Sequence, residues 1–323
     1  MPACTILILT YKGKHHLELL LPTVQDAIEN YKGPFIIDVL IIDNGCDKGT
    51  RDFVRTHFPQ FRYEFSPVND YLFSLNPFIS SFDADYFLLL NDDLKLEKNI
   101  LNELLPVIEN DADIFAVTCH IMDFEGTATL SSVRTAKYSR GWLYNYYLDT
   151  TDAAMKYTLY PSGGASIFRT ALFNRLNGFD TLYRPAYYED TDLGIRAWQH
   201  GWKVVYNPRA IVFHREGGTI NDYFKKNTIE RNIFKNSVLW MIKNVHYPGF
   251  LFWFYLLLPY RLVINFFTNN NISIALLKAM KKLPEALSKR TRSGIIVEDT
   301  WWLKQLNLPY TKEAKNLKEP EFV

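Results

Sequence analysis

The sequence predicts an α/β fold, in which a mostly parallel sheet is covered by helices and is followed by a helical C-terminal extension. Over the first 120 residues, short β-rich runs alternate with helical patterns, which is typical of a parallel sheet with helical crossovers. Most of the strand candidates have a continuous apolar character, as expected for strands buried on both faces. An apolar run and then a basic run after residue 248 indicate the extension.

The predicted elements of the first half follow one another closely. The strand candidates are Thr5–Thr10, Ile36–Asp43, Arg62–Phe65, Tyr86–Leu90 and Ile114–Thr118. The helix candidates between them are His15–Tyr31, Thr50–His57, Tyr71–Phe82 and Leu96–Glu109. Ligands of such open sheets bind beyond the carboxyl ends of the strands. We therefore expect a binding site near Thr10, Asp43 and residues 91–93.

The second half is less regular. Residues 121–160 are polar and rich in tyrosine without a steady period, which we interpret as an active-site loop region. The elements expected after it are a helix at Arg169–Leu176, a helix from near Glu189, a strand pair at Lys203–Tyr206 and Ala210–Phe213 that ends at His214, and a helix at Asp222–Val245. We expect residues 1–245 to form the α/β domain and residues 246–323 to form the extension.

Charge is divided unevenly along the chain. The 36 basic and 35 acidic side chains give a net charge of +1, which argues against nucleic acid as a partner. Residues 1–222 hold 20 basic and 28 acidic side chains, a net charge of −8, whereas residues 223–323 hold 16 and 7, a net charge of +9. A basic tail on an acidic body suits an anionic membrane surface.

The cysteines and the N-terminus indicate the compartment. Cys4, Cys46 and Cys119 are odd in number, far apart and not in a metal-binding or redox spacing, which favours a reducing environment. The chain opens with a strand-like apolar run and not with a secretory signal. We therefore expect a cytoplasmic protein.

The segment "YFLLLNDDL" carries adjacent acids, Asp92 and Asp93, at the end of a buried strand. Carboxylates delivered into a cleft in this way are hard oxygen ligands suited to Mg²⁺ or Mn²⁺. The other interpretation is a turn in which an aspartate caps the following helix. Asp43, before Asn44-Gly45, has the same two interpretations: an acceptor for a nucleoside, or a turn residue.

A second acidic group lies in "YYEDTDLGIR", where Glu189, Asp190 and Asp192 fall in a first helical turn with Arg196 one turn later. Acids there complement the helix dipole, but a carboxylate at a helix start can also act as a general base. His214 follows an apolar strand, and it is either a structural hydrogen-bonding group or a metal ligand that completes a site begun by Asp93.

Seven segments, taken in order, resemble the glycosyltransferase family 2 enzymes with the GT-A fold, over about residues 3–245. The resemblance is to the bacterial rhamnosyltransferase-like branch that builds surface polysaccharides. The segments are "ILILTYKG", "VLIIDNGCDKGT", "YFLLLNDDLKL", "SGGASIFRTALFNRLNGFD", "YYEDTDLGIRAWQHGWKV", "IVFHREGGT" and "KKNTIERNIFKNS".

The resemblance implies a role for each site residue. Thr10, Tyr11 and Asp43 would line the nucleoside pocket, and Asp92 would contact the ribose or the metal. The other roles implied are Asp93 and His214 at the divalent metal, Asp190 as catalytic base, Glu189 orienting it or the acceptor, and Arg196 steadying the acids or the diphosphate. The first position of the family's DxD motif is Asn91 here, so the metal would depend mainly on Asp93 and His214.

The activity that the resemblance implies is an inverting, Mn²⁺- or Mg²⁺-dependent transfer of a sugar from a nucleoside-diphosphate donor, such as dTDP-rhamnose. The acceptor would be a glycan, free or linked to a lipid. The alternative from another class is a non-catalytic subunit that binds sugar nucleotides and organises a membrane glycan assembly. The presence of both Asp93 and Asp190 favours the enzyme.

The extension begins with ten apolar residues, Gly249–Leu258, before Pro259, Tyr260 and Arg261 interrupt the run. A spanning helix needs about 20 predominantly apolar residues, and an arginine at its centre costs about 2.5–3.5 kcal/mol. An anchor in the plane of the inner membrane face is therefore favoured over a full span, and an oligomer-forming helical hairpin is the alternative. The basic residues that follow are Lys278, Lys281, Lys282, Lys289, Arg290 and Arg292.

Overall fold

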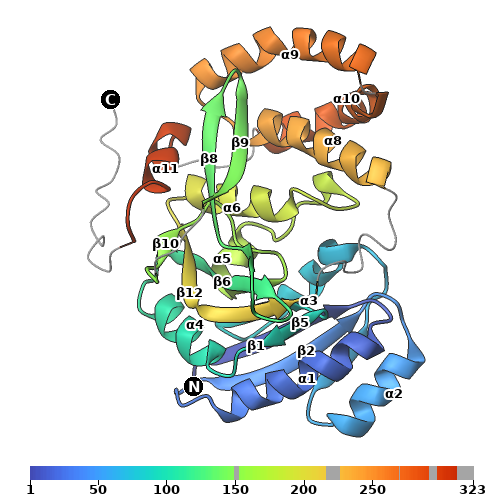
Figure 1. Cartoon of the computed structure of the whole chain (residues 1–323), viewed down its shortest axis with the longest axis vertical. Helices are drawn as coiled ribbons and strands as arrows, with labels where there is room; N and C mark the ends of the chain where they lie inside the picture. The colour runs from blue at the N-terminus through green and yellow to red at the C-terminus, as the bar shows by residue number, and fades with distance from the viewer. Residues whose placement is uncertain (149–152, 216–225, 269, 291–296, 311–323) are drawn as a thin grey trace.

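The computed structural model describes residues 1–148, 153–215, 226–268, 270–290 and 297–310. At its centre is a ten-stranded sheet in the order β10-β12-β6-β11-β4-β1-β2-β3, with β5 beside β12 and β7 beside β6 (Figure 1). The strands are β1 (Ala3–Thr10), β2 (Ile36–Asp43), β3 (Arg62–Phe65), β4 (Tyr86–Asn91), β5 (Leu94–Leu96), β6 (Ile114–Asp123), β7 (Thr129–Ser131), β10 (Lys156–Tyr157), β11 (Ala165–Arg169) and β12 (Lys203–His214). Strands β8 (Val133–Ser139) and β9 (Trp142–Leu148) form a separate hairpin.

The long strands of the sheet are mostly parallel, as the apolar runs predict. Strands β3, β2, β1 and β4 pair in parallel, and so do β6 and β12, while β11 lies antiparallel between β4 and β6. The central strands consist almost wholly of buried aliphatic and aromatic side chains, which only a sheet covered on both faces can accommodate.

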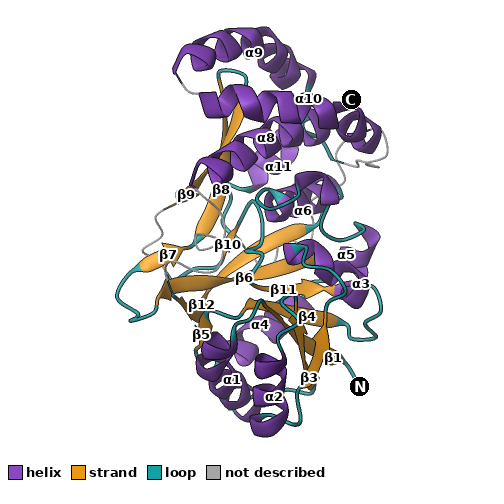
Figure 2. Ribbon diagram, turned by 90° about the vertical axis from the view of Figure 1, so that its right-hand side faces the viewer, coloured by secondary structure: helices purple, strands orange, loops and turns teal. Residues whose placement is uncertain are grey.

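Helices lie on both sides of the sheet. In Figure 2, α1, α2 and α4 lie below it, and α6 and the C-terminal helices lie above it. The helices are α1 (Lys14–Glu29), α2 (Lys48–His57), α3 (Asn76–Ile79), α4 (Ile100–Glu109), α5 (Thr170–Arg175), α6 (Glu189–Gln199), α8 (Lys226–Asn244), α9 (Pro248–Thr268), α10 (Asn270–Arg290) and α11 (Asp299–Gln305), with 3-10 turns η1 (Tyr71–Leu75) and η2 (Thr181–Tyr183).

Several predicted boundaries are wrong. Residues 121–160 are not a loop region, because they contain the end of β6 and all of β7 to β10. Both faces of the β8–β9 hairpin are partly exposed, so its side chains show no steady alternation. Strand β11 is not predicted at all, since five residues between a glycine pair and a helix are too few to show a period.

Three further corrections concern element ends. The strand pair predicted at residues 203–213 is one strand, β12, whose register shifts between Asn207 and Ile211; Pro208 there has no N–H for the ladder. Residues 94–96 form β5, and α4 begins only at Ile100. The helix predicted at Tyr71–Phe82 is a 3-10 turn followed by the short α3. The predicted start of the next helix, Asp222, lies outside the described residues.

The C-terminal helices pack against the α/β body. Helix α10 runs beside α8 and α9, and α9 lies farthest from the sheet (Figure 1). Helix α9 continues through Pro259 and does not end there. Within the described part of the chain, no helix is both long enough and apolar enough to cross a membrane. The predicted boundary at residue 245 falls between α8 and α9, and the independence of the two parts stays a prediction.

Candidate active site

The predicted strand ends lie side by side at one edge of the sheet. Thr10 at the end of β1 is opposite Asp43 at the end of β2. On the other side of β1, Leu9 is opposite Asn91 at the end of β4. The carboxyl ends of three parallel strands therefore meet, which is where open α/β sheets bind ligands.

Asp43 organises the turn after β2. One of its carboxylate oxygens accepts a hydrogen bond from Gly45 N at 2.6 Å, and the other accepts from Asp47 N and the Tyr63 hydroxyl, both at 2.7 Å. The residue is completely buried. These are the contacts that the turn interpretation predicts, and the nucleoside role of Asp43 stays a prediction.

Asp92 joins β4 to the segment after β1. Its Oδ2 accepts a hydrogen bond from Thr10 Oγ1 at 2.5 Å, and its Oδ1 lies 3.2 Å from His16 Nδ1. Any side chain at Gly13 would collide with Asp92 Oδ2. The structure thus brings Thr10 and Asp92 together, and Tyr11 is half-buried next to them.

Asp93 lies beside His214, as the predicted metal pair requires. Asp93 Oδ2 is 3.4 Å from His214 Nε2. Asp93 Oδ1 is buried, and nothing in the described chain donates a hydrogen bond to it. A buried carboxylate oxygen without a partner costs free energy, and a divalent cation would satisfy it. The two residues fit a metal, although the described residues contain no cluster of three or more protein ligands.

A pocket of about 270 Å³ lies next to this pair. Asp190 from α6, His214 from β12 and Asn91 from β4 all line it. Seven of its lining residues come from residues 121–160, which we expected near the active site. The other lining residues are Leu94, Thr118, Ile121, Leu130, Ser131, Ser132, Arg134, Tyr147, Tyr160, Ser162, Gly164 and Ala165.

Asp190 reaches this pocket from the first turn of α6. Its Oδ1 accepts a hydrogen bond from Thr191 N at 2.6 Å. Thr191 Oγ1 donates to the same oxygen at 3.2 Å, so both contacts from Thr191 end at Oδ1 and Oδ2 is the candidate to take a proton. The backbone before it is strained, because Tyr187 and Tyr188 have φ angles of 72° and 77°, values that bulky residues rarely adopt.

The strained loop is held by α8. Asn236, which is completely buried, donates from its side-chain amide to the carbonyl oxygens of Tyr183, Ala186 and Tyr187, at 2.7, 2.9 and 2.7 Å. Lys235 Nζ donates to Arg184 O at 2.6 Å. Contacts from a helix about 50 residues later in the chain therefore position the catalytic candidate.

Glu189 and Asp190 are adjacent acids at the start of α6. Burial raises the pKa of Glu189 to about 8, and the negative charge of Asp190 adds to the rise. Burial also raises the pKa of Asp190, although hydrogen bonds from Thr191 and the charge of Arg134 oppose that rise. At neutral pH Glu189 is therefore mainly protonated, whereas Asp190 must be ionised to act as a base.

The raised pKa of Glu189 makes stability depend on pH. The pKa is about 8 in the folded protein and about 4.3 in an unfolded chain, so the folded state binds the extra proton between these values. The free energy of unfolding should therefore fall as the pH rises through this window. Glu189→Gln should flatten this fall, as measured by urea unfolding between about pH 5 and pH 8. The exposed Glu64→Gln is the control; an unchanged slope in Glu189→Gln would contradict the assignment.

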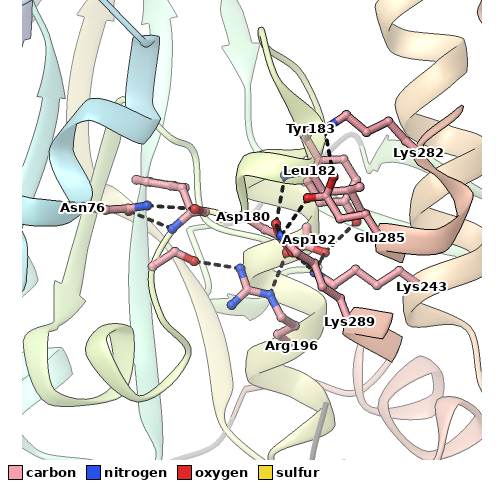
Figure 3. Close-up of polar contacts among 12 residues, drawn as sticks. Asn76, Asp180, Leu182, Tyr183, Asp192, Arg196, Lys243, Lys282, Glu285 and Lys289 are labelled. Atoms are coloured by element: carbon pink, nitrogen blue, oxygen red, sulfur yellow. Dashed lines mark hydrogen bonds and ion pairs between the residues drawn. The ribbon is translucent and has the colours of Figure 1, made fainter. Parts of the chain in front are cut away.

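Arg196 lies in a separate cluster behind the pocket. Its Nε donates to Asp192 Oδ2 at 2.6 Å, and its other nitrogens donate to the carbonyl oxygens of Leu176 and Gly178. Of the two roles predicted for Arg196, these contacts are those of a residue that steadies the acids. Figure 3 shows the cluster, where Arg196 and Asp192 of α6 meet Lys243 of α8 and Lys289 of α10.

Sequence reasoning missed Arg134, Tyr160 and Asn236. Arg134 and Tyr160 lie in the irregular region before β11, where no motif marks them. Asn236 lies within "KKNTIERNIFKNS", which the sequence analysis used only to support the resemblance. Asn236 is a buried polar residue of α8 whose partners lie about 50 residues earlier in the chain. Its role therefore leaves no local signal in one sequence.

Comparisons with known proteins identify the family of this chain. A model of the family described as glycosyl transferase family group 2 matches residues 86–281, which extends into the predicted extension. The N-acetylglucosaminyl-diphospho-decaprenol L-rhamnosyltransferase of Mycobacterium tuberculosis is 25% identical over 237 residues, covering 65% of this chain and 75% of that protein, in both strain CDC 1551 / Oshkosh and strain ATCC 25618 / H37Rv.

Solved structures share the fold at low sequence identity. GalNAc-T7 with UDP, GalNAc and Mn²⁺ superposes with a TM-score of 0.65 and 12% identity, over 99% of this chain but only 58% of that one. S. aureus TarS 1-349 superposes with a TM-score of 0.55 and 14% sequence identity, over 92% of this chain and 84% of that one. The mannosyltransferase PcManGT of Pyrobaculum calidifontis, in complex with GDP-Man and Mn²⁺, superposes with a TM-score of 0.51 and 14% sequence identity. The match covers 90% of this chain and 74% of that one. Because the family model covers more than half of the chain, this protein belongs to glycosyl transferase family group 2 and is a glycosyltransferase with the GT-A fold.

Proposed function

We propose that the protein transfers a sugar, with inversion, from a nucleoside-diphosphate donor to a lipid-linked glycan acceptor in surface polysaccharide synthesis. The observation that carries the proposal is that Asp190 and His214 line one pocket, and that His214 is paired with Asp93. One pocket thus contains a candidate base for the acceptor and borders a candidate metal pair for the donor.

The donor side of the proposal uses the three strand ends. Thr10, Tyr11 and Asp43 would border the nucleoside, and Asp92 would contact the ribose. The mycobacterial relative is an L-rhamnosyltransferase, which supports dTDP-rhamnose as the donor. Arg196 would act on the donor only indirectly, because its Nε donates to Asp192 Oδ2 at 2.6 Å.

Asp93 and His214 would hold Mn²⁺ or Mg²⁺. The metal would neutralise the negative charge that develops on the departing diphosphate. Two of the solved structures with this fold contain Mn²⁺, which supports the proposal. The unpartnered Oδ1 of Asp93 is the feature of this chain that fits the ion.

The reaction proposed for Asp190 is a single displacement. Asp190 Oδ2 takes the proton of the acceptor hydroxyl, and the hydroxyl oxygen forms a bond to the anomeric carbon of the donor. The bond from that carbon to the diphosphate oxygen breaks, and its electron pair leaves with the diphosphate. Attack opposite the leaving group inverts the anomeric configuration. Neutral Glu189 keeps a second negative charge away from the base.

Asp93→Ala should weaken metal-dependent binding of the nucleotide. We expect the dissociation constant of dTDP in the presence of Mn²⁺ to rise more than about tenfold, since even outer-shell partners of a metal contribute that much. Titration calorimetry with and without Mn²⁺ measures the change without any turnover. The control is Asp83→Ala, which removes an exposed acid that lies shortly before β4. Equal Mn²⁺ dependence in both variants would remove Asp93 from the metal site.

We also propose that α9 docks on the inner face of the cell membrane. Its outer side exposes Phe252, Trp253, Tyr255, Leu256 and Tyr260, each between 49% and 64% exposed. Arg261, the charge that interrupts the apolar run, points inward, where its Nη2 donates to Arg140 O at 2.8 Å. A helix with an aromatic outer side lies in the membrane interface, and the exposed Lys278 and Lys281 of α10 add attraction to anionic lipid.

Removing apolar side chains from the outer side of α9 should reduce membrane binding. The double variant Phe252→Ser and Leu256→Ser removes two neighbours on one helix face. Flotation with vesicles that contain phosphatidylglycerol should recover less of this variant than of the unmodified protein. The control, Ile36→Ser with Val68→Ser, removes two equally exposed apolar side chains from the α/β domain. Equal flotation of both variants would exclude α9 as the docking surface.

A further inference from the structure

Arg134 is a cation in the candidate active site that the mechanism above does not use. Its backbone is fixed, because its N–H donates to Thr158 Oγ1 at 2.9 Å and its carbonyl oxygen accepts from Leu159 N at 2.7 Å. Its side chain lines the same pocket as Asp190. The β8–β9 hairpin therefore presents the Arg134 side chain to the pocket from a fixed backbone position.

The guanidinium lies close to two aromatic rings, and no acid within the described ranges forms an ion pair with it. It lies directly over the ring of Tyr147 and 5.6 Å from the centre of the Tyr160 ring. No hydrogen bond or ion pair joins it to any residue within the described ranges. Burial lowers the pKa of Arg134, and the nearby Tyr160 and Asp190 offset part of that fall. A half-buried guanidinium with five unused donors is a site for a planar or tetrahedral anion.

The hairpin that carries Arg134 also leads to α9. Arg134 and Tyr147 are paired near the base of the hairpin, at the pocket. At its tip, Gly141 packs against the backbone of Trp253 so closely that no side chain would fit. Between these points, Tyr138 stacks on Phe250 with ring centres 3.8 Å apart. Figure 1 shows β8 and β9 rising from the sheet to α9.

We propose that Arg134 binds the phosphate that links the acceptor sugar to its lipid carrier. The inference rests on the proposed function and deepens it. An acceptor whose lipid lies at α9 and whose hydroxyl reaches Asp190 must pass along the β8–β9 hairpin, and its phosphate then comes to Arg134. The ring of Tyr160, which also lines the pocket, would contact the sugar next to that phosphate. Bidentate hydrogen bonds from the guanidinium to phosphate oxygens supply the specificity.

The test compares two acceptor probes by titration calorimetry, which needs no turnover. One probe is N-acetylglucosaminyl diphosphofarnesol, and the other is the uncharged octyl N-acetylglucosaminide. Arg134→Gln should raise the dissociation constant of the first at least tenfold and leave that of the second unchanged. Arg134→Lys, which keeps the charge without the planar fork, should give an intermediate value. Lys137→Gln on the same strand, exposed on the opposite face of the hairpin, should change neither.

The outcomes separate the acceptor from the donor. Equal losses for both probes, or a failure of the unmodified protein to bind the charged probe more tightly, would overturn the proposal. A tenfold loss of dTDP binding in the presence of Mn²⁺, with acceptor binding unchanged, would assign Arg134 to the donor phosphate and overturn it as well. If sugar transfer is absent but the charged probe still depends on Arg134, the subsite stands and the proposed function fails.

Discussion

Asp190→Asn should lower kcat for sugar transfer by about 10² to 10⁴-fold, the usual contribution of a general base. The asparagine oxygen can still accept the hydrogen bond from Thr191 N, which is 2.6 Å from Oδ1 in the native protein. The start of α6 and the pocket wall should therefore remain in place. The substituted amide cannot take a proton from the acceptor, so only the chemical step is affected. Initial rates at saturating donor and acceptor measure the loss.

Two controls distinguish the loss of the catalytic base in Asp190→Asn from a disruption of the fold. Binding of dTDP with Mn²⁺ should be the same in Asp190→Asn as in the native protein, because the proposed donor site lies at Asp93 and the strand ends. Asp26→Asn, an exposed acid on α1, should transfer sugar at the native rate. An Asp190→Asn variant that keeps full activity would show that the base lies elsewhere.

Lys243→Ala should destabilise the protein by about 3–5 kcal/mol, the usual result of removing one partner from a buried ion pair. Lys243 Nζ lies 2.6 Å from Asp180 Oδ2 and 2.6 Å from Asp192 Oδ1. The side chains of Lys243 and Asp192 are 4% and 0% exposed, so water cannot replace the lost ammonium. In the variant, Arg196 would still pair with Asp192 and Lys289 with Asp180. Neither residue forms an ion pair with both carboxylates, as Lys243 does. Urea unfolding at neutral pH measures the change.

A matched lysine provides the control. Lys282 also forms an ion pair, with Glu285 at 2.8 Å, but their side chains are 44% and 35% exposed. Exposed pairs contribute about 0–1 kcal/mol, so Lys282→Ala should unfold close to the native midpoint. A similar stability for Lys243→Ala and Lys282→Ala would mean that the buried cluster does not hold the C-terminal helices on the α/β body.

The same cluster predicts how the stability lost in Lys243→Ala depends on pH. Burial would raise the pKa of Asp192, but Arg196 and Lys243 outweigh burial and lower it. A carboxyl with a lowered pKa stabilises the fold above its unfolded pKa, about 3.9, and this stabilisation is lost as the pH falls toward the folded value. The difference between Lys243→Ala and the native protein should therefore be largest near neutral pH and should shrink below about pH 4.

Sequence patterns predicted the parts of the fold that depend on near neighbours. Strands β1 and β2 were predicted within two residues of their ends, because buried parallel strands are apolar over most of their length. The acids at residues 92–93 and 189–190 were recognised because each group occupies adjacent positions. The parallel arrangement then explains why Thr10, Asp43 and Asn91 meet, since parallel strands end at one edge.

The residues that position and complete the site escaped prediction because their partners are distant in the chain. Asn236 holds a loop about 50 residues earlier, and Arg134 lines the same pocket as Asp190 although the two are far apart in the chain. The charge of the tail is a similar case. Of the basic residues after α9, Lys289 pairs with Asp180 and Arg290 donates to the carbonyl oxygens of Ile242 and Val245. Those charges hold the tail on the body and are not available to a membrane.

The sequence by itself determined that the chain is an α/β protein with acids at the ends of its strands and at the start of one helix. It also determined that the acidic body and the basic tail differ in net charge. Only the tertiary structure decided which of these groups face the pocket. Burial and distant partners set the pKa of Glu189, leave Asp93 Oδ1 and the guanidinium of Arg134 open to a ligand, and direct Arg196 and Lys289 into the interior. Charge is a property of composition, whereas the availability of a charge depends on which distant segments fold against it.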